Sequence, residues 1–100
     1  MMVLSSLKRF LDPKGHELEC RLSDLIERAV EFGLRSEDAA SARELLEHNE
    51  GGLALDTVLT QLYEYSVPVD NNFIEDSLAI AVSMKIDPIA YKFIYEQLPK

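Results

Sequence analysis

The stretch LLEHNEGGLALDTVLTQLYE, residues 45–64, joins two apolar helical patterns through a short polar segment and a pair of glycines. Apolar positions after the glycines recur at intervals of three and four, which is the spacing of one helix face: Leu55, Val58, Leu59 and Leu62. We expect Gly51 and Gly52 to close the first helix, because glycine readily adopts the left-handed conformation of a helix cap. A connection this short predicts two helices packed as an antiparallel or sharply angled hairpin.

Helical signals also precede the hairpin. Residues 18–32 repeat apolar side chains at intervals of four and three, and Gly33 can supply a left-handed cap at their end. Ser36 is a good N-cap for the first hairpin helix, because its hydroxyl can accept a hydrogen bond from a free backbone amide. In residues 1–16, leucines at helical spacing are followed by DPKG, which we interpret as a turn. This segment is predicted to be an N-terminal extension or a short helix.

Two more helices are predicted after the hairpin. Residues 72–84 are apolar on most sides, a pattern typical of a helix in the middle of a bundle. The N-cap of this helix is one of three polar side chains: Asp70, Asn71 or Asn72. Asp87 and Pro88 suit the N-cap and first position of a final helix. With no strand pattern or internal repeat, the sequence predicts one all-α domain over residues 1–100, a small bundle of five to six helices with a central tight helical hairpin.

The acidic residues are unevenly distributed. The formal net charge is -8, and residues 44–84 contain eight Asp or Glu but no Lys or Arg. Nucleic acids and anionic membranes are poor partners for such a chain, because phosphate contacts need a basic surface. A basic protein or a cation is the expected partner, since an acidic field attracts and steers positive charge. The alternative is that the acids only keep the protein soluble.

The sequence also predicts a cytoplasmic protein. The apolar run before Lys8 is too short for a signal peptide. The longest unbroken apolar run, residues 78–82, is far shorter than the roughly 20 residues that span a bilayer. The lone Cys20 cannot form an internal disulfide, which fits a reducing compartment.

Residues suited to catalysis are few. His16 and His48 are the only histidines and Cys20 is the only thiol, and the chain contains neither an HExxH nor a CxxC motif. His48 lies four residues from Glu44 and next to Glu47, but a metal site needs at least three converging ligands. We therefore expect no enzymatic activity, no catalytic residue, no metal and no cofactor.

Two local features point to a binding surface instead. Glu47 and Glu50 stand near the predicted end of a helix, where the helix dipole disfavours negative charge, and broken local rules of this kind are often functional. Tyr63 and Tyr65 flank Glu64, and tyrosines beside acids are common interface anchors. The alternative for the tyrosines is that they cover the edge of the bundle with their hydroxyls in water.

Residues 42–70 resemble the MafI family of bacterial immunity proteins. The family pattern has the core (F/Y/L)(I/L)EHxExGLA, then an amphipathic helix, an acid before the loop and an (I/V)P(I/V) turn. The residues of this chain that match it are Leu46, Glu47, His48, Glu50, Gly52, Leu53, Ala54, Asp56, Glu64, Val67, Pro68 and Val69. Gly51 stands where the pattern has an aromatic residue, and the motif does not extend to residues 1–16.

The resemblance implies a function. Proteins of this family are small cytosolic partners of secreted or contact-delivered polymorphic toxins, and they protect the producing cell by binding the C-terminal effector domain of the toxin. Many such effectors are nucleases with basic clefts, so the resemblance implies inhibition by occlusion through an acidic surface. The partner-binding residues that we predict are Glu44, Glu47, His48, Glu50, Asp56, Tyr63 and Glu64. The alternative function is a non-catalytic helical adaptor or dimerisation module with a regulatory role; the sequence does not define an oligomeric state.

Overall fold

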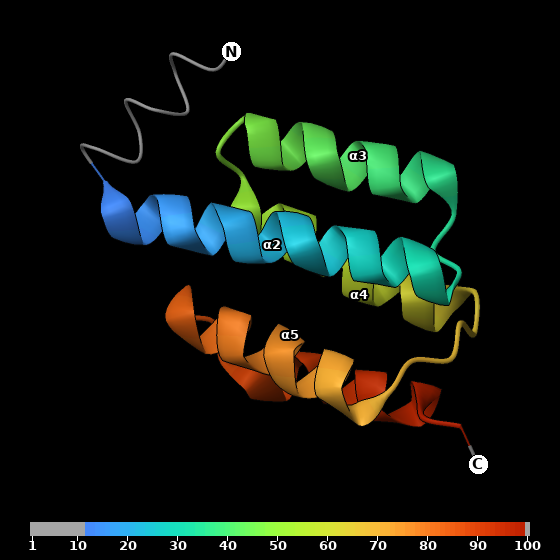
Figure 1. Ribbon diagram of the computed structural model, residues 1–100. Helices are drawn as coiled ribbons and strands as arrows, with labels where there is room; N and C mark the ends of the chain where they lie inside the picture. The colour runs from blue at the N-terminus through green and yellow to red at the C-terminus, as the bar shows by residue number, and fades with distance from the viewer. Residues whose placement is uncertain (1–11, 100) are drawn as a thin grey trace.

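The computed structural model describes residues 12–99, which form five helices and no strand. The elements are α2 (Pro13–Phe32), α3 (Ser36–Glu47), α4 (Gly51–Glu64), α5 (Asn71–Ser83) and the 3₁₀ helix η1 (Pro88–Gln97). Consecutive helices run in alternating directions, with α3, α2 and α5 side by side in front and α4 and η1 behind them (Figure 1). The predicted all-α bundle is confirmed. Most of the N-terminal segment for which a short helix was considered, residues 1–11, lies outside the described residues.

The second hairpin helix, α4, is the centre of the bundle. It packs against α2, α3, α5 and η1, and its residues Leu55, Leu59 and Leu62 are completely buried. The prediction that the helix over residues 72–84 lies in the middle is wrong, because α5 exposes more than half of the Val82 side chain. Aliphatic side chains are common on protein surfaces, so an apolar pattern on most sides of a helix overestimates its burial.

The residues DPKG form the start of α2 and not a separate turn. The Asp12 carboxylate accepts a hydrogen bond from the Gly15 amide at 3.0 Å, and Pro13 occupies the first helical position, where its missing amide costs nothing. At the other end, Gly33 has a φ of 128° and the amide of Leu34 donates to the Ala29 carbonyl at 2.9 Å. The predicted glycine cap of this helix is therefore confirmed.

The start of α3 differs from the prediction. Ser36 is the first residue of the helix and not its N-cap, a position taken by Arg35 without a side-chain cap. The nearly buried Asp38 carboxylate instead accepts hydrogen bonds from Arg35 Nε at 2.8 Å and from Gln61 Nε2 at 3.2 Å. The Arg35 bond holds the pKa of Asp38 below its ordinary value. Asp38 thereby ties the first turn of α3 to α4.

The two C-terminal helices begin with aspartate caps. Asp70 is the N-cap of α5 and accepts from the Phe73 amide at 2.8 Å, which selects it from the three candidates. Asp87 accepts from the Ile89 amide at 3.0 Å and Pro88 follows at the first position, as predicted. The last helix is 3₁₀ and not α, and it bends at Tyr91, where the backbone is not helical. Long 3₁₀ runs are uncommon because their hydrogen-bond geometry is poor.

Candidate functional site

The connection between α3 and α4 consists of residues 48–50 and is closed by Asn49. Asn49 has a φ of 63°, and the Glu50 amide donates to the Leu45 carbonyl at 2.8 Å. Asparagine adopts this left-handed conformation more readily than most residues with a side chain. The prediction that Gly51 and Gly52 close the first helix is therefore wrong, because they are the first two residues of α4.

The two glycines serve close packing. A Cβ atom on Gly51 would lie 3.0 Å from Leu22 Cδ1 and 3.6 Å from Met84 Sδ, and one on Gly52 would lie 3.7 Å from Ile86 Cδ1. The backbone at the start of α4 thus lies directly against side chains from α2 and from the segment that follows α5. An aromatic side chain at position 51, as in the family pattern, would require Leu22 to move.

Four of the seven predicted partner-binding residues gather at this end of the hairpin. Glu44 and Glu47 share a face of the last turn of α3, because residues three apart are neighbours on a helix, and His48 is the residue that caps this turn. Glu50 follows in the connection, and all four side chains are exposed. We call these four residues the hairpin cluster.

The carboxylates of the hairpin cluster lack basic counter-ions within the part of the chain that the structure describes. Among residues 12–99, no ion pair joins Glu44, Glu47 or Glu50 to a Lys or Arg. Arg43 is the one base on α3, and it pairs with Glu27 of α2 at 2.7 Å. Glu47 ends α3, where the dipole disfavours its charge, whereas Glu50 directly precedes α4, where the dipole favours it. The cluster is thus an exposed group of negative charges, of which only Glu50 has a favourable helix end.

Asp56 and Tyr63 lie elsewhere, along the contact between α4 and η1. The Tyr91 hydroxyl donates to Asp56 Oδ1 at 3.0 Å, and the Tyr63 ring packs edge-on against Phe93 with ring centroids 5.0 Å apart. Burial, and then the Asp56 hydrogen bond and charge, raise the pKa of Tyr91 to about 12. Both predicted contact residues therefore have a role within the fold, although their side chains remain partly accessible.

Glu64 is the last residue of α4, at the end opposite to the hairpin cluster (Figure 1). A helix rises 1.5 Å per residue, so the fourteen residues of α4 separate its two ends by about 20 Å. Its neighbour Tyr65 lies beneath the Arg35 guanidinium, 3.9 Å from the ring centroid. The structure therefore divides the seven predicted residues into the hairpin cluster, the Asp56–Tyr63 pair and Glu64.

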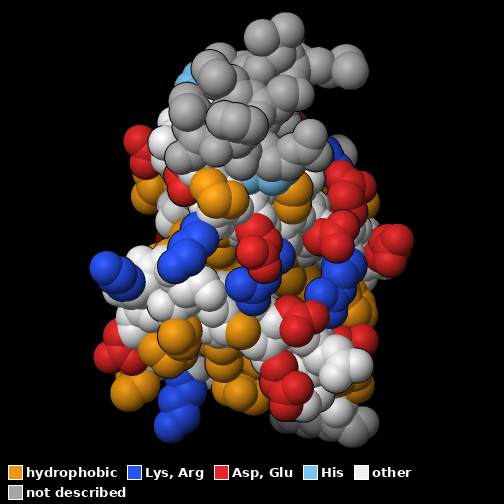
Figure 2. Space-filling view, turned by 60° about the vertical axis from the view of Figure 1, so that its left-hand side comes forward, with side chains coloured by type: hydrophobic (Ala, Val, Ile, Leu, Met, Phe, Trp, Pro, Cys, Tyr) orange, Lys and Arg blue, Asp and Glu red, His pale blue; other side chains and the backbone are white. Residues whose placement is uncertain are grey.

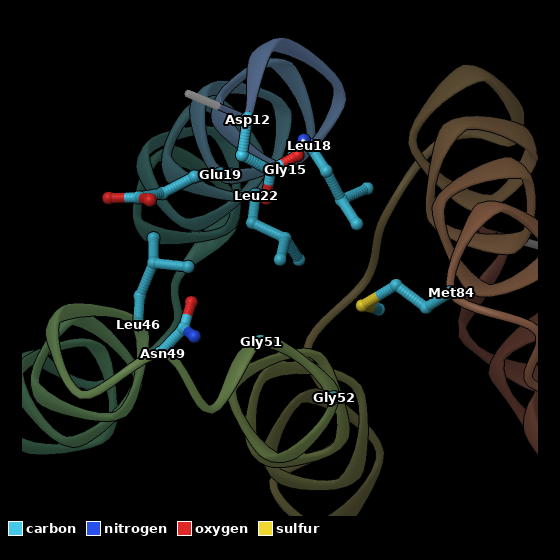
Figure 3. A pocket seen from close by; sticks show the side chains of 10 residues that line it. All are labelled: Asp12, Gly15, Leu18, Glu19, Leu22, Leu46, Asn49, Gly51, Gly52 and Met84. Atoms are coloured by element: carbon cyan, nitrogen blue, oxygen red, sulfur yellow. Dashed lines mark hydrogen bonds between the residues drawn. The ribbon is translucent and has the colours of Figure 1, made fainter. Parts of the chain in front are cut away.

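A hollow of about 320 Å³ lies beside the connection between α3 and α4, with Asn49 and Gly51 in its lining. Leu18, Leu22 and Met84 point into the space between α2, the start of α4 and the end of α5, and Leu46 approaches from α3 (Figure 3). Sequence analysis did not predict this hollow. Leu18, Leu22 and Leu46 are apolar residues of predicted helices. Periodicity predicts which side chains face the core, but it does not predict where the packed helices leave a gap.

Other chemical groups are sparse in the described residues. His16 Nε2 and the exposed Cys20 Sγ lie 3.6 Å apart, one turn from each other on α2. Over residues 12–99, no three His, Cys, Asp or Glu side chains come together as metal ligands would. In the same range, no helix is both long and apolar enough to cross a bilayer.

Comparison with known proteins adds no identification. No protein-family model matches the chain, and neither the curated proteins nor the solved structures give a match. The fold therefore defines the class, a small all-α bundle, and the function has to be argued from the residues themselves.

Proposed function

We propose that this protein is an immunity protein of the MafI type, which binds the effector domain of a secreted or contact-delivered bacterial toxin and neutralises it in the cytoplasm. The observation that carries the proposal is the hairpin cluster: Glu44, Glu47 and Glu50 are exposed at one end of the α3–α4 hairpin and have no basic partner among residues 12–99. The same segment holds the EHxExGLA-like motif, Glu47 to Ala54, on which the family resemblance rests.

Inhibition follows from charge and shape. Exposed carboxylates resemble phosphate groups to a protein that binds nucleic acid, so a nuclease with a basic cleft is the partner that this surface suits best. Opposite charges speed association and disfavour partners that carry the wrong sign. The helical hairpin then covers the cleft or an adjoining surface, and no covalent step or cofactor is needed.

The test reverses the charge of the hairpin cluster in one variant, Glu44→Lys, Glu47→Lys and Glu50→Lys. We expect affinity for the C-terminal domain of the toxin encoded beside this protein to fall by about 100-fold or more, because like charges would face each other. Copurification and protection of cells that express the toxin domain should be lost. Circular dichroism and thermal melting should stay unchanged, since these side chains are exposed and the stability lost when Glu50 before α4 becomes Lys is offset by the stability gained when Glu47 at the end of α3 does.

The matched control reverses three other exposed acids, Asp24, Glu31 and Glu96, and changes the net charge by the same amount. This control should bind and protect as the wild type does. Asp56 is left unchanged in both variants. Its carboxylate accepts a hydrogen bond from the Tyr91 hydroxyl, so replacing it with Lys would disturb the fold. Equal loss of binding in both variants would show that only net charge matters, and unchanged binding in the first would remove the hairpin cluster from the interface.

A helical adaptor or dimerisation module is the second candidate. It is favoured by large apolar side chains that the described surface leaves in solvent: Leu53 at 54%, Val82 at 58% and Ile89 at 72% exposure. Self-association in analytical ultracentrifugation, together with no toxin gene beside this one, would favour this second function over immunity.

A further inference from the structure

We propose that the hollow between α2, α3, α4 and α5 receives one large apolar side chain of the toxin domain, flanked on the toxin by Lys or Arg. This inference rests on the proposed function and deepens it, because it states what the partner presents to the hairpin. The occupant is thus an apolar side chain on a basic surface.

The lining of the hollow favours an apolar occupant. Leu18, Leu46 and Met84 are only partly buried, so the hollow leaves apolar surface in contact with water. Gly51 widens it, since a side chain there would point toward Leu22 and Met84. The volume of about 320 Å³ lies at the lower end of ordinary binding pockets, which suits a single side chain better than a larger ligand. Deep apolar contacts of this kind dominate the binding energy of many interfaces.

The surrounding charge favours a basic partner. Asp12 is among the residues that line the hollow, and no described Lys or Arg lines it. The hollow and the hairpin cluster also share one segment: Asn49 and Gly51 line the hollow, whereas His48 and Glu50 belong to the cluster. Specific protein–protein interfaces usually have an apolar centre surrounded by a polar or charged rim. The hollow therefore combines apolar walls with an acidic lining residue, Asp12, and it lies beside the connection that carries Glu50.

The test fills the hollow in the full-length chain with Leu18→Trp. The control is Val30→Trp, which changes an exposed residue twelve positions along the same helix, about 18 Å away. The natural chain has no Trp, so the emission of each variant also reports whether its new indole is sheltered from water. Affinity for the purified toxin C-terminal domain is measured by isothermal titration calorimetry, and folding is measured by thermal melting.

We expect Leu18→Trp to raise the dissociation constant about tenfold or more, with a sheltered indole and an unchanged melting temperature. Val30→Trp should bind within about twofold of the wild type. Met84→Gln, which makes one wall polar without adding bulk, provides a second variant should Leu18→Trp fail to fold, and it should weaken binding in the same direction. Unchanged affinity in a folded variant of this kind would overturn the inference.

Further outcomes distinguish a toxin side chain from other occupants of the hollow, and they distinguish this inference from the proposed function. A changed melting temperature with unchanged affinity would assign the hollow to the chain's own packing, including contacts of residues 1–11, and would overturn the inference. Loss of a wild-type dimer with unchanged toxin affinity would assign it to a second copy and would also overturn it. If charge reversal of the hairpin cluster abolishes binding while both hollow variants bind normally, this inference fails and the proposed function stands. If the wild type does not bind the toxin domain, both fail together.

Discussion

Gly33 ends α2 in a backbone conformation that any side chain would strain. Its φ of 128° lies outside the regions that L-residues normally adopt, and a Cβ there would also lie 3.3 Å from Val67 Cγ1. The amide of Gly33 and that of Leu34 satisfy carbonyl groups in the last turn of α2. This single residue therefore redirects the chain from α2 into α3.

Gly33→Ala should lower the free energy of unfolding by about 1–2 kcal/mol, because alanine would strain the cap. Gly52→Ala is the matched control, since position 52 lies in a helix and a Cβ there meets only Ile86 Cδ1 at an ordinary distance. The control should leave stability unchanged or raise it by up to about 0.5 kcal/mol. Urea denaturation followed by circular dichroism measures both, and equal effects would contradict this account of Gly33.

Single residues also show where sequence reasoning reaches its limit. The cap at Gly33 could be predicted, because glycine after an apolar stripe is a local signal. Asn49 was not identified as a cap, because the two glycines that follow it give a stronger version of the same signal. The Asp38–Gln61 hydrogen bond could not be found in the sequence either, because the two residues are 23 positions apart.

At the scale of elements, η1 is held in place by specific polar contacts as well as by its apolar residues. The Tyr91 hydroxyl donates to Asp56 of α4. The end of η1 is fixed to the loop before α5, where Gln97 Nε2 donates to the Val67 carbonyl at 3.0 Å and the Val69 amide donates to the Gln97 carbonyl at 2.9 Å. These bonds give the bent 3₁₀ helix a defined position against α4 and the segment that follows it.

Tyr91→Phe should reduce the free energy of unfolding by about 1.5 kcal/mol at neutral pH, since it removes one hydrogen bond to a carboxylate. The pKa of Tyr91 is raised in the folded state to about 12, above the value of about 10 for a free tyrosine. The stabilisation is therefore fully present below pH 10 and is lost as the pH rises toward 12.

Urea denaturation between pH 8 and pH 12 checks this prediction. The wild type should lose stability more steeply above pH 10 than Tyr91→Phe does. Tyr95→Phe is the control, because Tyr95 is exposed and should leave the alkaline slope of the wild type unchanged. Parallel slopes for the wild type and Tyr91→Phe would show that the hydroxyl contributes nothing to folding.

The existence of each described helix could be predicted more reliably than its place in the bundle. Periodicity located α2, α3, α4 and α5, because each carries its own apolar face. It predicted a central hairpin but did not single out α4 within it, since the position of a helix depends on which of its neighbours cover it. It also did not indicate a 3₁₀ geometry for η1, which bends where Tyr91 turns inward toward α4.

For the molecule as a whole, the Asp and Glu side chains do not form one continuous acidic surface. On the face in Figure 2, Asp and Glu side chains are interspersed with Lys and Arg. Asp76, one of the eight acids in the segment without bases, pairs with Arg28 at 2.7 Å. The hairpin cluster differs, because the described residues supply its carboxylates with no such partner. Long-range attraction of a basic protein should therefore be directed to this end of the bundle.

The association rate with the toxin domain should fall about tenfold or more between 0.05 M and 0.5 M salt, because screening shortens the reach of the acidic field. Stopped-flow measurements at several salt concentrations provide the test. The variant with Asp24, Glu31 and Glu96 reversed should keep a steep salt dependence, whereas the hairpin-cluster variant should show little. An association rate that is insensitive to salt in the wild type would mean that the cluster does not steer the partner.

Residue type and spacing predict the helical class, the approximate position of each described helix and the excess of negative charge, because each of these properties depends on one segment at a time. The packing of the helices set three features that were not predicted: α4 contacts all the other described helices, Asp56 and Tyr63 face η1, and Glu64 lies far from the hairpin cluster. It also created the hollow beside Gly51. These features depend on which residues from distant segments meet, and that is set by the packing of complete helices.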